Sequence, residues 1–219
     1  MPKFVQPTYT IERPFPDDSL EFLERVARTC YKSEGRIKEG SAEKLLRSLL
    51  KRGHMSIFEH VHASVRMNYD IGVSREMNRH RHASIAEMST RYVDLEGGLV
   101  FIQPAWAATC EEYPSFKGND ALDALDIAAD SAVTSYALLR ECGAPPQEAR
   151  CVLPLMTATE TVITANLREW LHILKLRCDK SAHPDLYRVT RALAREIFSP
   201  FGGLAPDLFN IVKWEGGNA

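Results

Sequence analysis

The sequence predicts an α+β fold within a single domain over residues 1–219, and three observations lead to this prediction. Segments with the alternating polarity of strands occur singly between segments with the apolar spacing of helices. The centre of the chain is rich in arginine and histidine. With 219 residues and no internal repeat, low-complexity tract or linker, the chain is long enough to bury one sizeable core.

The composition is ordinary for a soluble globular protein, with 45% hydrophobic and 26% charged residues. A net charge of -2 gives no electrostatic case for a nucleic-acid or membrane partner. The segment MPKFVQPTYTIERPFP has no apolar signal region, and no apolar run approaches the roughly eighteen residues of a membrane span. We expect a cytoplasmic protein whose five cysteines are reduced and mostly fill the core, because they form no CxxC pair: Cys30, Cys110, Cys142, Cys151 and Cys178.

Two helices are expected first. Asp18 or Ser19 can cap the first one, which has apolar residues at helical spacing: Leu23, Val26, Ala27 and Cys30. The second starts near Ser41, ends at Gly53 and buries a leucine stripe: Leu45, Leu46, Leu49 and Leu50.

Residues 60–67 alternate polar and apolar side chains, which predicts a half-buried strand. His60 and His62 then share a face, and five of the seven histidines lie within residues 54–82, which suggests a metal site. No cysteine or aspartate completes a ligand spacing, and the neighbouring arginines would repel a cation. We therefore expect no metal and a polar floor for an anionic ligand.

Further along, residues 71–82 are expected to form a helix that carries arginines, residues 88–94 an extended piece, and residues 97–118 a loop. Asn119 opens a long helix that stops at the sequence Gly143-Ala144-Pro145-Pro146. Its core face is Leu122, Leu125, Ala129, Val133, Tyr136 and Leu139.

Pro145 or Pro146 suits the first turn of a short helix that presents Arg150. Residues 157–166 predict a second strand because they are rich in Thr and Val. Residues 168–177 and 183–198 predict two more helices, the last stopped by Pro200.

The densest polar chemistry lies in the segment REMNRHRHASIAEMSTRY, residues 75–92. A helix through Arg75 and Arg79 would place both guanidinium groups on one face. Clustered arginines suit planar, bidentate recognition of a phosphate, and Arg79, Arg91, Arg150 and Ser89 can supply its donors. The alternative interpretation is a solvated face with scattered charges.

The sequence Arg79-His80-Arg81, followed after seven residues by Ser89, resembles the RHR-x7-S signature of the flavin-dependent thymidylate synthases. Three further blocks resemble that family in the same order, over roughly residues 20 to 200. They are Gly53-His54-Met55-Ser56-Ile57-Phe58-Glu59-His60, Glu148-Ala149-Arg150-Cys151-Val152-Leu153-Pro154-Leu155, and Asn166-Leu167-Arg168 with His172 and Leu176-Arg177.

The resemblance implies a small central, mainly antiparallel sheet flanked by long helices, in a homotetramer whose active sites are built from more than one subunit. It implies reductive methylation at uracil C5 of UMP or dUMP. Methylenetetrahydrofolate supplies the methylene, reduced FAD supplies the hydride, and NADPH regenerates the reduced flavin. There is no GxGxxG sequence for a Rossmann-type flavin site.

The resemblance also assigns residues. Arg177 activates the uracil, since a guanidinium against N3 and its neighbouring carbonyl stabilises the ionised ring and raises electron density at C5. No cysteine has an evident activating base for attack at C6. With Arg177, the nucleotide-binding set is Glu76, Met77, Asn78, Arg79, Glu87, Met88, Ser89, Thr90, Arg91 and Arg150. The flavin-binding set is Ser56, Arg79, His80, Arg81, Glu87, Asn166, Leu167, Arg168 and His172.

The chain departs from the family pattern near the expected nucleotide. Glu76 stands where the family usually has Gln, Ile85 and Ala86 where it usually has Tyr and Asn, and Cys30 where it usually has Ser. A carboxylate can accept two hydrogen bonds from a ribose diol, so we expect UMP, as in the family's nucleoside-antibiotic (polyoxin-type) branch. The alternative is that Glu76 pairs with an arginine and the substrate is dUMP.

Two interpretations from other classes stay open. One is a nucleic-acid-binding module on the Arg/His segment, although a pI near 6.4 and the lack of an aromatic-interleaved basic patch disfavour it. The other is a non-catalytic flavoprotein, which the retained Arg177 and Ser89 disfavour.

Overall fold

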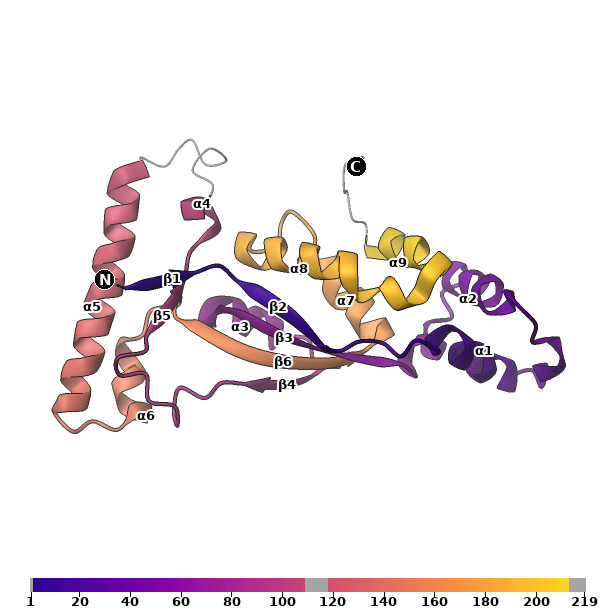
Figure 1. Cartoon of the computed structure of the whole chain (residues 1–219), viewed down its shortest axis with the longest axis horizontal. Coiled ribbons are helices and arrows are strands. Elements are labelled where there is room, and N and C mark those ends of the chain that lie inside the picture. The colour runs from indigo at the N-terminus through magenta and orange to yellow at the C-terminus, as the bar shows by residue number, and fades with distance from the viewer. Residues whose placement is uncertain (1, 109–117, 213–219) are drawn as a thin grey trace. The chain divides into compact units, whose positions relative to one another are not determined.

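The computed structural model describes residues 2–108 and 118–212 and confirms the α+β class (Figure 1). The helices are α1 (Ser19–Thr29), α2 (Ser41–Lys51), α3 (Ile71–Met77), α4 (Ala105–Ala108), α5 (Gly118–Glu141), α6 (Pro146–Ala149), α7 (Leu167–Arg177), α8 (Pro184–Ile197) and α9 (Ala205–Val212). The strands are β1 (Lys3–Val5), β2 (Thr8–Arg13), β3 (His62–Asp70), β4 (Ser84–Glu87), β5 (Val100–Ile102) and β6 (Ala158–Asn166).

The strands form two small sheets. A four-stranded antiparallel sheet has the order β2-β3-β6-β4, and β1 pairs with β5 in parallel, with Phe4 opposite Phe101. Side chains alternate between buried and less buried along β3 and β6, because successive residues of a strand point to opposite faces. The sequence predicts this alternation for residues 60–67, whereas the strand over residues 157–166 is predicted from its Thr and Val content. The two predicted strands are therefore confirmed.

The described residues fall into two compact units. Unit 1 comprises those within Met1–Thr8, Met67–Arg79 and Ala86–Thr161, and unit 2 those within Tyr9–Arg66, His80–Ile85 and Val162–Ala219. The chain passes between the units several times, so neither is a continuous stretch of sequence. The single domain over residues 1–219 stays a prediction.

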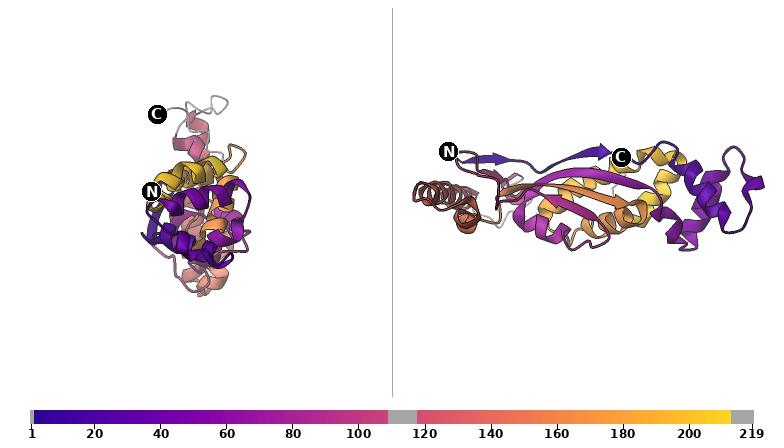
Figure 2. Two further views of the ribbon diagram at one scale, coloured as in Figure 1. Left: turned by 90° about the vertical axis from the view of Figure 1, so that its right-hand side faces the viewer. Right: turned by 90° about the horizontal axis from the view of Figure 1, so that it is seen from below.

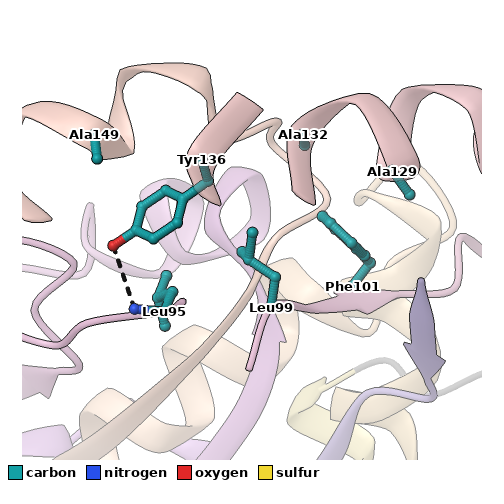
Figure 3. Close-up of a cluster of buried hydrophobic side chains, with 7 residues drawn as sticks. All are labelled: Leu95, Leu99, Phe101, Ala129, Ala132, Tyr136 and Ala149. Carbon is teal, nitrogen blue, oxygen red and sulfur yellow. Dashed lines mark hydrogen bonds between the residues drawn. The ribbon is translucent and has the colours of Figure 1, made fainter. Parts of the chain in front are cut away.

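The core of unit 1 lies under the long helix α5 (Figure 3). Tyr136 is buried there, and its hydroxyl accepts a hydrogen bond from the backbone N–H of Leu95 at 3.2 Å. Ala129 is also fully buried, whereas Leu122 and Leu125, at the start of the helix, are only half-buried. The predicted core face therefore holds most firmly in the second half of the helix.

Unit 2 contains α1 and α2, which lie side by side in both Figure 1 and Figure 2. Leu23 and Leu46 are fully buried, while Leu45 and Leu50 are half-buried. Gly53 has φ +72°, a left-handed conformation that favours glycine, and it follows the end of α2 as predicted.

Helix α7 packs against the other helices of unit 2 through fully buried side chains, among them Trp170. The Trp170 indole N–H donates to the backbone carbonyl of Ala63 in β3 at 3.1 Å. The backbone N–H of Leu167 donates to the carbonyl of Val61 at 3.0 Å. These two bonds fix the start of α7 against the chain that enters β3.

The helix expected over residues 71–82 is shorter, since α3 ends at Met77. The Asn78 side chain donates to Ser74 Oγ at 3.3 Å and to Glu87 Oε2 at 3.1 Å, and the N–H of Arg79 bonds back to the carbonyl of Glu76. These contacts end the helix before Arg79, so the prediction that Arg75 and Arg79 share a helix face is wrong.

Other boundaries are also corrected. Residues 88–94 are not extended, because the Ser89 carbonyl accepts from the N–H groups of Tyr92 and Val93 and closes a turn. The loop expected over residues 97–118 contains β5 and α4, and its residues 109–117 lie outside the described ones. The sequence interpretation also missed β1, β2, β4 and α9. Strand β3 starts at His62, so His60 lies outside the strand and does not share a strand face with His62.

The cysteines do not mostly fill the core. Cys30, Cys142 and Cys151 are exposed and Cys178 is buried, while Cys110 lies outside the described residues. Each exposed cysteine lies near the end of a helix, where the buried stripe has already finished. Within residues 2–108 and 118–212, no helix combines the length and apolar character that crossing a bilayer requires.

Candidate active site

In unit 1, helix α3 and strand β4 position a hydrogen-bonded carboxylate. Asp70 caps α3, since its side chain accepts from the N–H of Val73 at 2.7 Å. Glu87 on β4 then accepts from Ser74 at 2.7 Å, from Thr159 at 3.1 Å and from Asn78. Three donors hold this carboxylate in one orientation, so it is a fixed acceptor beside the turn that carries Arg79.

A second group in unit 1 forms around the turn that begins at Ser89. Ser89 Oγ accepts from the N–H of Arg91, and Arg150 Nη1 donates to Thr90 Oγ1 at 3.2 Å. Gln147 of α6 joins the two arginines, because its side-chain oxygen accepts from Arg91 and its backbone carbonyl from Arg150. Two guanidinium groups and two hydroxyls thus face one turn, which is suitable donor chemistry for a phosphate.

The other predicted nucleotide residues differ in exposure. Met77 is fully buried, so its side chain belongs to the core. Asn78 and Arg79 are exposed, and Glu76 and Met88 are half-buried. Of the specificity candidates on β4, Ile85 is half-buried and Ala86 exposed.

In unit 2, His80 and Arg177 meet although 97 residues separate them. Arg177 Nε donates to His80 Nε2 at 3.1 Å, and His80 Nδ1 lies 3.7 Å from Glu169 Oε1. The His172 ring packs edge-on to His80, with the ring centroids 5.7 Å apart. His80 and Glu169 are 5% and 6% exposed and so largely shielded from water, whereas Arg177 is half-buried and His172 exposed.

A pocket of about 480 Å³ opens beside this chain in unit 2 and falls within the range of about 300–1,000 Å³ typical of ligand sites. Its lining is Glu59, His82, Asn166, Arg168, Glu169 and His172. The guanidinium and imidazole groups are donors of the kind that a pyrophosphate and a flavin ring require. These residues therefore fit a flavin, and Asn166, Arg168 and His172 were predicted to bind one.

Two of these pocket residues also have structural contacts. Asn166 is the N-cap of α7, with its side-chain oxygen accepting from the N–H of Glu169 at 2.8 Å. Arg168 forms a 2.6 Å ion pair with Glu59. Of the remaining flavin candidates, Ser56 and Arg81 are exposed, while the Leu167 side chain is buried in the core.

The electrostatics keep His80 neutral. Burial, followed by the charges of Arg177 and His172, lowers the pKa of His80 from 6.5 to about 4. Since Arg177 can only donate, His80 Nε2 must be the acceptor and the ring proton sits on Nδ1.

This pKa predicts a loss of stability in acid. The unfolded chain binds a proton at His80 below about pH 6.5 and the folded chain only below about pH 4, so the free energy of unfolding falls as pH drops between these values. We expect His80 to contribute a loss on the order of 2–3 kcal/mol. Urea unfolding at several pH values measures it. His80→Gln should flatten the slope, whereas substitution of the exposed His54 by Gln should leave it unchanged.

The ligand atoms of His80, Glu169 and His172 lie within 4.8 Å of one another, which is close enough for one metal ion. The Arg177 contact opposes such a site. It uses the lone pair of His80 Nε2, leaves the proton on Nδ1, and holds a positive charge 3.1 Å from the ring. The geometry favours a hydrogen-bonded chain over a metal centre.

Sequence reasoning did not select several residues that organise the site. Ser74 and Thr159 orient Glu87, Gln147 joins two arginines, and Glu169 faces His80. Of these residues, only Gln147 and Glu169 could have been found from the sequence, since each lies directly beside a residue of a recognised block.

Comparisons with known proteins agree with the resemblance. The family described as "Thymidylate synthase complementing protein" matches residues 15–206. The flavin-dependent thymidylate synthase of Mycobacteroides abscessus is 31% identical over 210 residues, covering 88% of this chain and 79% of that protein. The enzyme of the same name from Geobacter sulfurreducens is 30% identical over 195 residues, covering 84% and 78%.

Among solved structures, the fold is similar to that of the UMP/dUMP methylase PolB from Streptomyces cacaoi, solved with 5-Br dUMP bound. The TM-score is 0.80 at 21% sequence identity, with 95% of this chain and 96% of that chain covered. Because the family match spans most of the chain and the relatives agree with it over most of their own length, the chain belongs to the flavin-dependent thymidylate synthases and is an FAD-dependent methyltransferase of that type, acting at C5 of a nucleotide.

Proposed function

We propose that the enzyme methylates C5 of UMP, with a methylene group from methylenetetrahydrofolate and NADPH as the reductant. The single observation that supports the mechanism is the partly buried His80–Arg177 contact, which holds a guanidinium at the end of α7. The alternative is the conversion of dUMP to dTMP for DNA precursors. Both use the same chemistry and differ only in the sugar.

The nucleotide phosphate would bind at the Ser89 turn. Arg91, Arg150, Ser89 and Thr90 supply charge-assisted donors there, and Gln147 keeps the two arginines together. Because these donors are fixed before the ligand arrives, little side-chain freedom is lost on binding.

Arg177 would act on the uracil ring. Its guanidinium would stabilise the negative charge that develops on N3 and the neighbouring carbonyl when C5 becomes nucleophilic. The contact with His80 restricts the guanidinium to one orientation, which is how a fixed donor lowers a barrier more than a mobile one.

The flavin would bind with its donors from Arg168 and His172 around the 480 Å³ pocket. When bound, FAD supplies the hydride chemistry that completes the methyl group. Asn166, as the cap of α7, would keep the pocket wall rigid. We further propose a homotetramer with shared active sites, as the family resemblance implies.

The choice of UMP rests on Glu76. This half-buried carboxylate belongs to α3, directly before the turn that carries Arg79, and a carboxylate can accept both hydrogen bonds of a 2′,3′-diol. PolB, which has a similar fold, is named as a methylase of both UMP and dUMP, so the preference for UMP rests on Glu76 alone.

We expect faster release of tritium from C5-labelled UMP than from dUMP, measured side by side with FAD, NADPH and methylenetetrahydrofolate. Glu76→Gln should shift the ratio of kcat/KM toward dUMP by about 10-fold, the effect of losing one good hydrogen bond to a charged group. Substitution of the exposed Glu21 by Gln is the matched control. An unchanged ratio in Glu76→Gln would show that this carboxylate does not read the sugar.

A further inference from the structure

Glu169 is absent from the predicted site residues, yet it is 6% exposed and faces the imidazole that bonds Arg177. It lies in the first turn of α7, and its backbone N–H bonds the Asn166 cap. The carboxylate is thus attached to a fixed part of the helix. His80 Nδ1 lies 3.7 Å from this carboxylate, too far for a hydrogen bond but close enough for the negative charge to act on the ring.

The two nitrogens of a neutral imidazole have different roles, and the hydrogen bond at one determines which carries the proton. Here Arg177 requires an unprotonated Nε2, because a guanidinium has no acceptor. The Glu169 carboxylate lies 3.7 Å from Nδ1, too far for a hydrogen bond, but its negative charge favours the proton on that nearby nitrogen. Both neighbours therefore favour the same tautomer.

We propose that Glu169 is a positioning residue, which fixes His80 as the Nδ1–H tautomer and through it orients the guanidinium of Arg177 toward the substrate ring. Without the carboxylate, only the Arg177 contact favours the Nδ1–H tautomer, so the Nε2–H tautomer becomes more populated, and in it two N–H groups oppose each other. Arg177 would rotate away from its orientation. The positioning role of Glu169 rests on the proposed function of Arg177, whereas the tautomer of His80 does not depend on that function.

Nitrogen-15 NMR of the histidine side chains in the flavin-bound protein tests the tautomer directly. His80→Gln identifies the signal by its loss. We expect Nδ1–H at His80 in the wild type near pH 7, where a ring with a pKa of about 4 is neutral. In Glu169→Ala we expect a shift toward Nε2–H. In Glu169→Gln, whose amide oxygen keeps a partial negative charge facing Nδ1, the wild-type tautomer should persist.

Kinetics distinguish positioning from folding. Glu169→Ala should lower kcat by about 10–100-fold, as losing the partner of a functional histidine does, with the nucleotide KM within about 3-fold of wild type. Glu169→Gln should recover most of kcat. Glu21→Ala, on α1, is the matched control for removing an exposed carboxylate, and the flavin absorption spectrum checks that each variant keeps its cofactor.

Each outcome decides between the alternatives. An Nε2–H tautomer in the wild type, or an unchanged tautomer in Glu169→Ala, would overturn the proposal. An inactive wild type with the Nδ1–H tautomer intact would instead contradict the proposed function and leave the Glu169–His80 pairing standing. Equal loss of kcat in Glu169→Ala and Glu169→Gln would also overturn it, since rescue by the amide oxygen is its specific consequence.

Discussion

Replacing Arg177 by alanine is expected to lower tritium release from C5 of the nucleotide by about 10²–10³-fold, the usual cost of removing one fixed donor from a developing anion. The guanidinium is held by His80 at 3.1 Å, so in the wild type its orientation is set before the nucleotide binds. The loss should fall mainly on kcat, because the donors at the Ser89 turn, which we propose bind the phosphate, remain in this variant.

Arg177→Lys separates charge from shape. A lysine keeps the positive charge but presents a single point donor and cannot bond the ring and His80 with a planar fork. We expect Arg177→Lys to reach less than a tenth of the wild-type rate. This corresponds to an activation barrier at least about 1.4 kcal/mol higher than in the wild type. Substitution of the exposed Arg13 by Ala controls for removing a guanidinium elsewhere. Wild-type release in Arg177→Ala would exclude this arginine from uracil activation.

Much of the fold could be predicted because local patterns determine it. The alternation along β3 and the apolar stripes of α1 and α2 each place one face of an element in a core. The end of α3 could not be predicted in this way, because it depends on the hydrogen bond that the Asn78 side chain donates to Glu87, nine residues further on. The short strand β1 forms only by pairing with β5, far along the chain.

The candidate site shows the same difference between local sequence patterns and contacts of distant residues. The recognised blocks contain Arg150 and His80, since sequence similarity preserves the groups that meet ligands. Thr159, which bonds Glu87, and Glu169, which faces His80, have partners far away in the sequence, so no spacing of residues indicates these contacts. Thr159 lies 72 residues from Glu87. Such pairs become visible only when three-dimensional contacts are known.

Replacing Trp170 by alanine is expected to lower the free energy of unfolding by about 3–5 kcal/mol, because a fully buried indole leaves a cavity that the surrounding core cannot fill. Trp170→Phe keeps most of the volume and loses only the N–H bond to the Ala63 carbonyl, so it should cost about 1–2 kcal/mol. Urea unfolding measures both. Leu176→Ala, exposed on the same helix, should stay within about 0.5 kcal/mol.

Trp170→Phe also tests whether α7 holds the residues of the candidate site in position. The helix carries Arg168, Glu169, His172 and Arg177, and the Trp170 indole bonds it to β3. If the helix is held by that bond, Trp170→Phe should weaken flavin retention together with stability, in proportion to the loosening of the helix. Full flavin retention in a destabilised Trp170→Phe protein would mean that the pocket keeps its shape without the indole N–H, and that the packing of the remaining apolar face, with Leu171 and Leu174 buried, is sufficient to position the site.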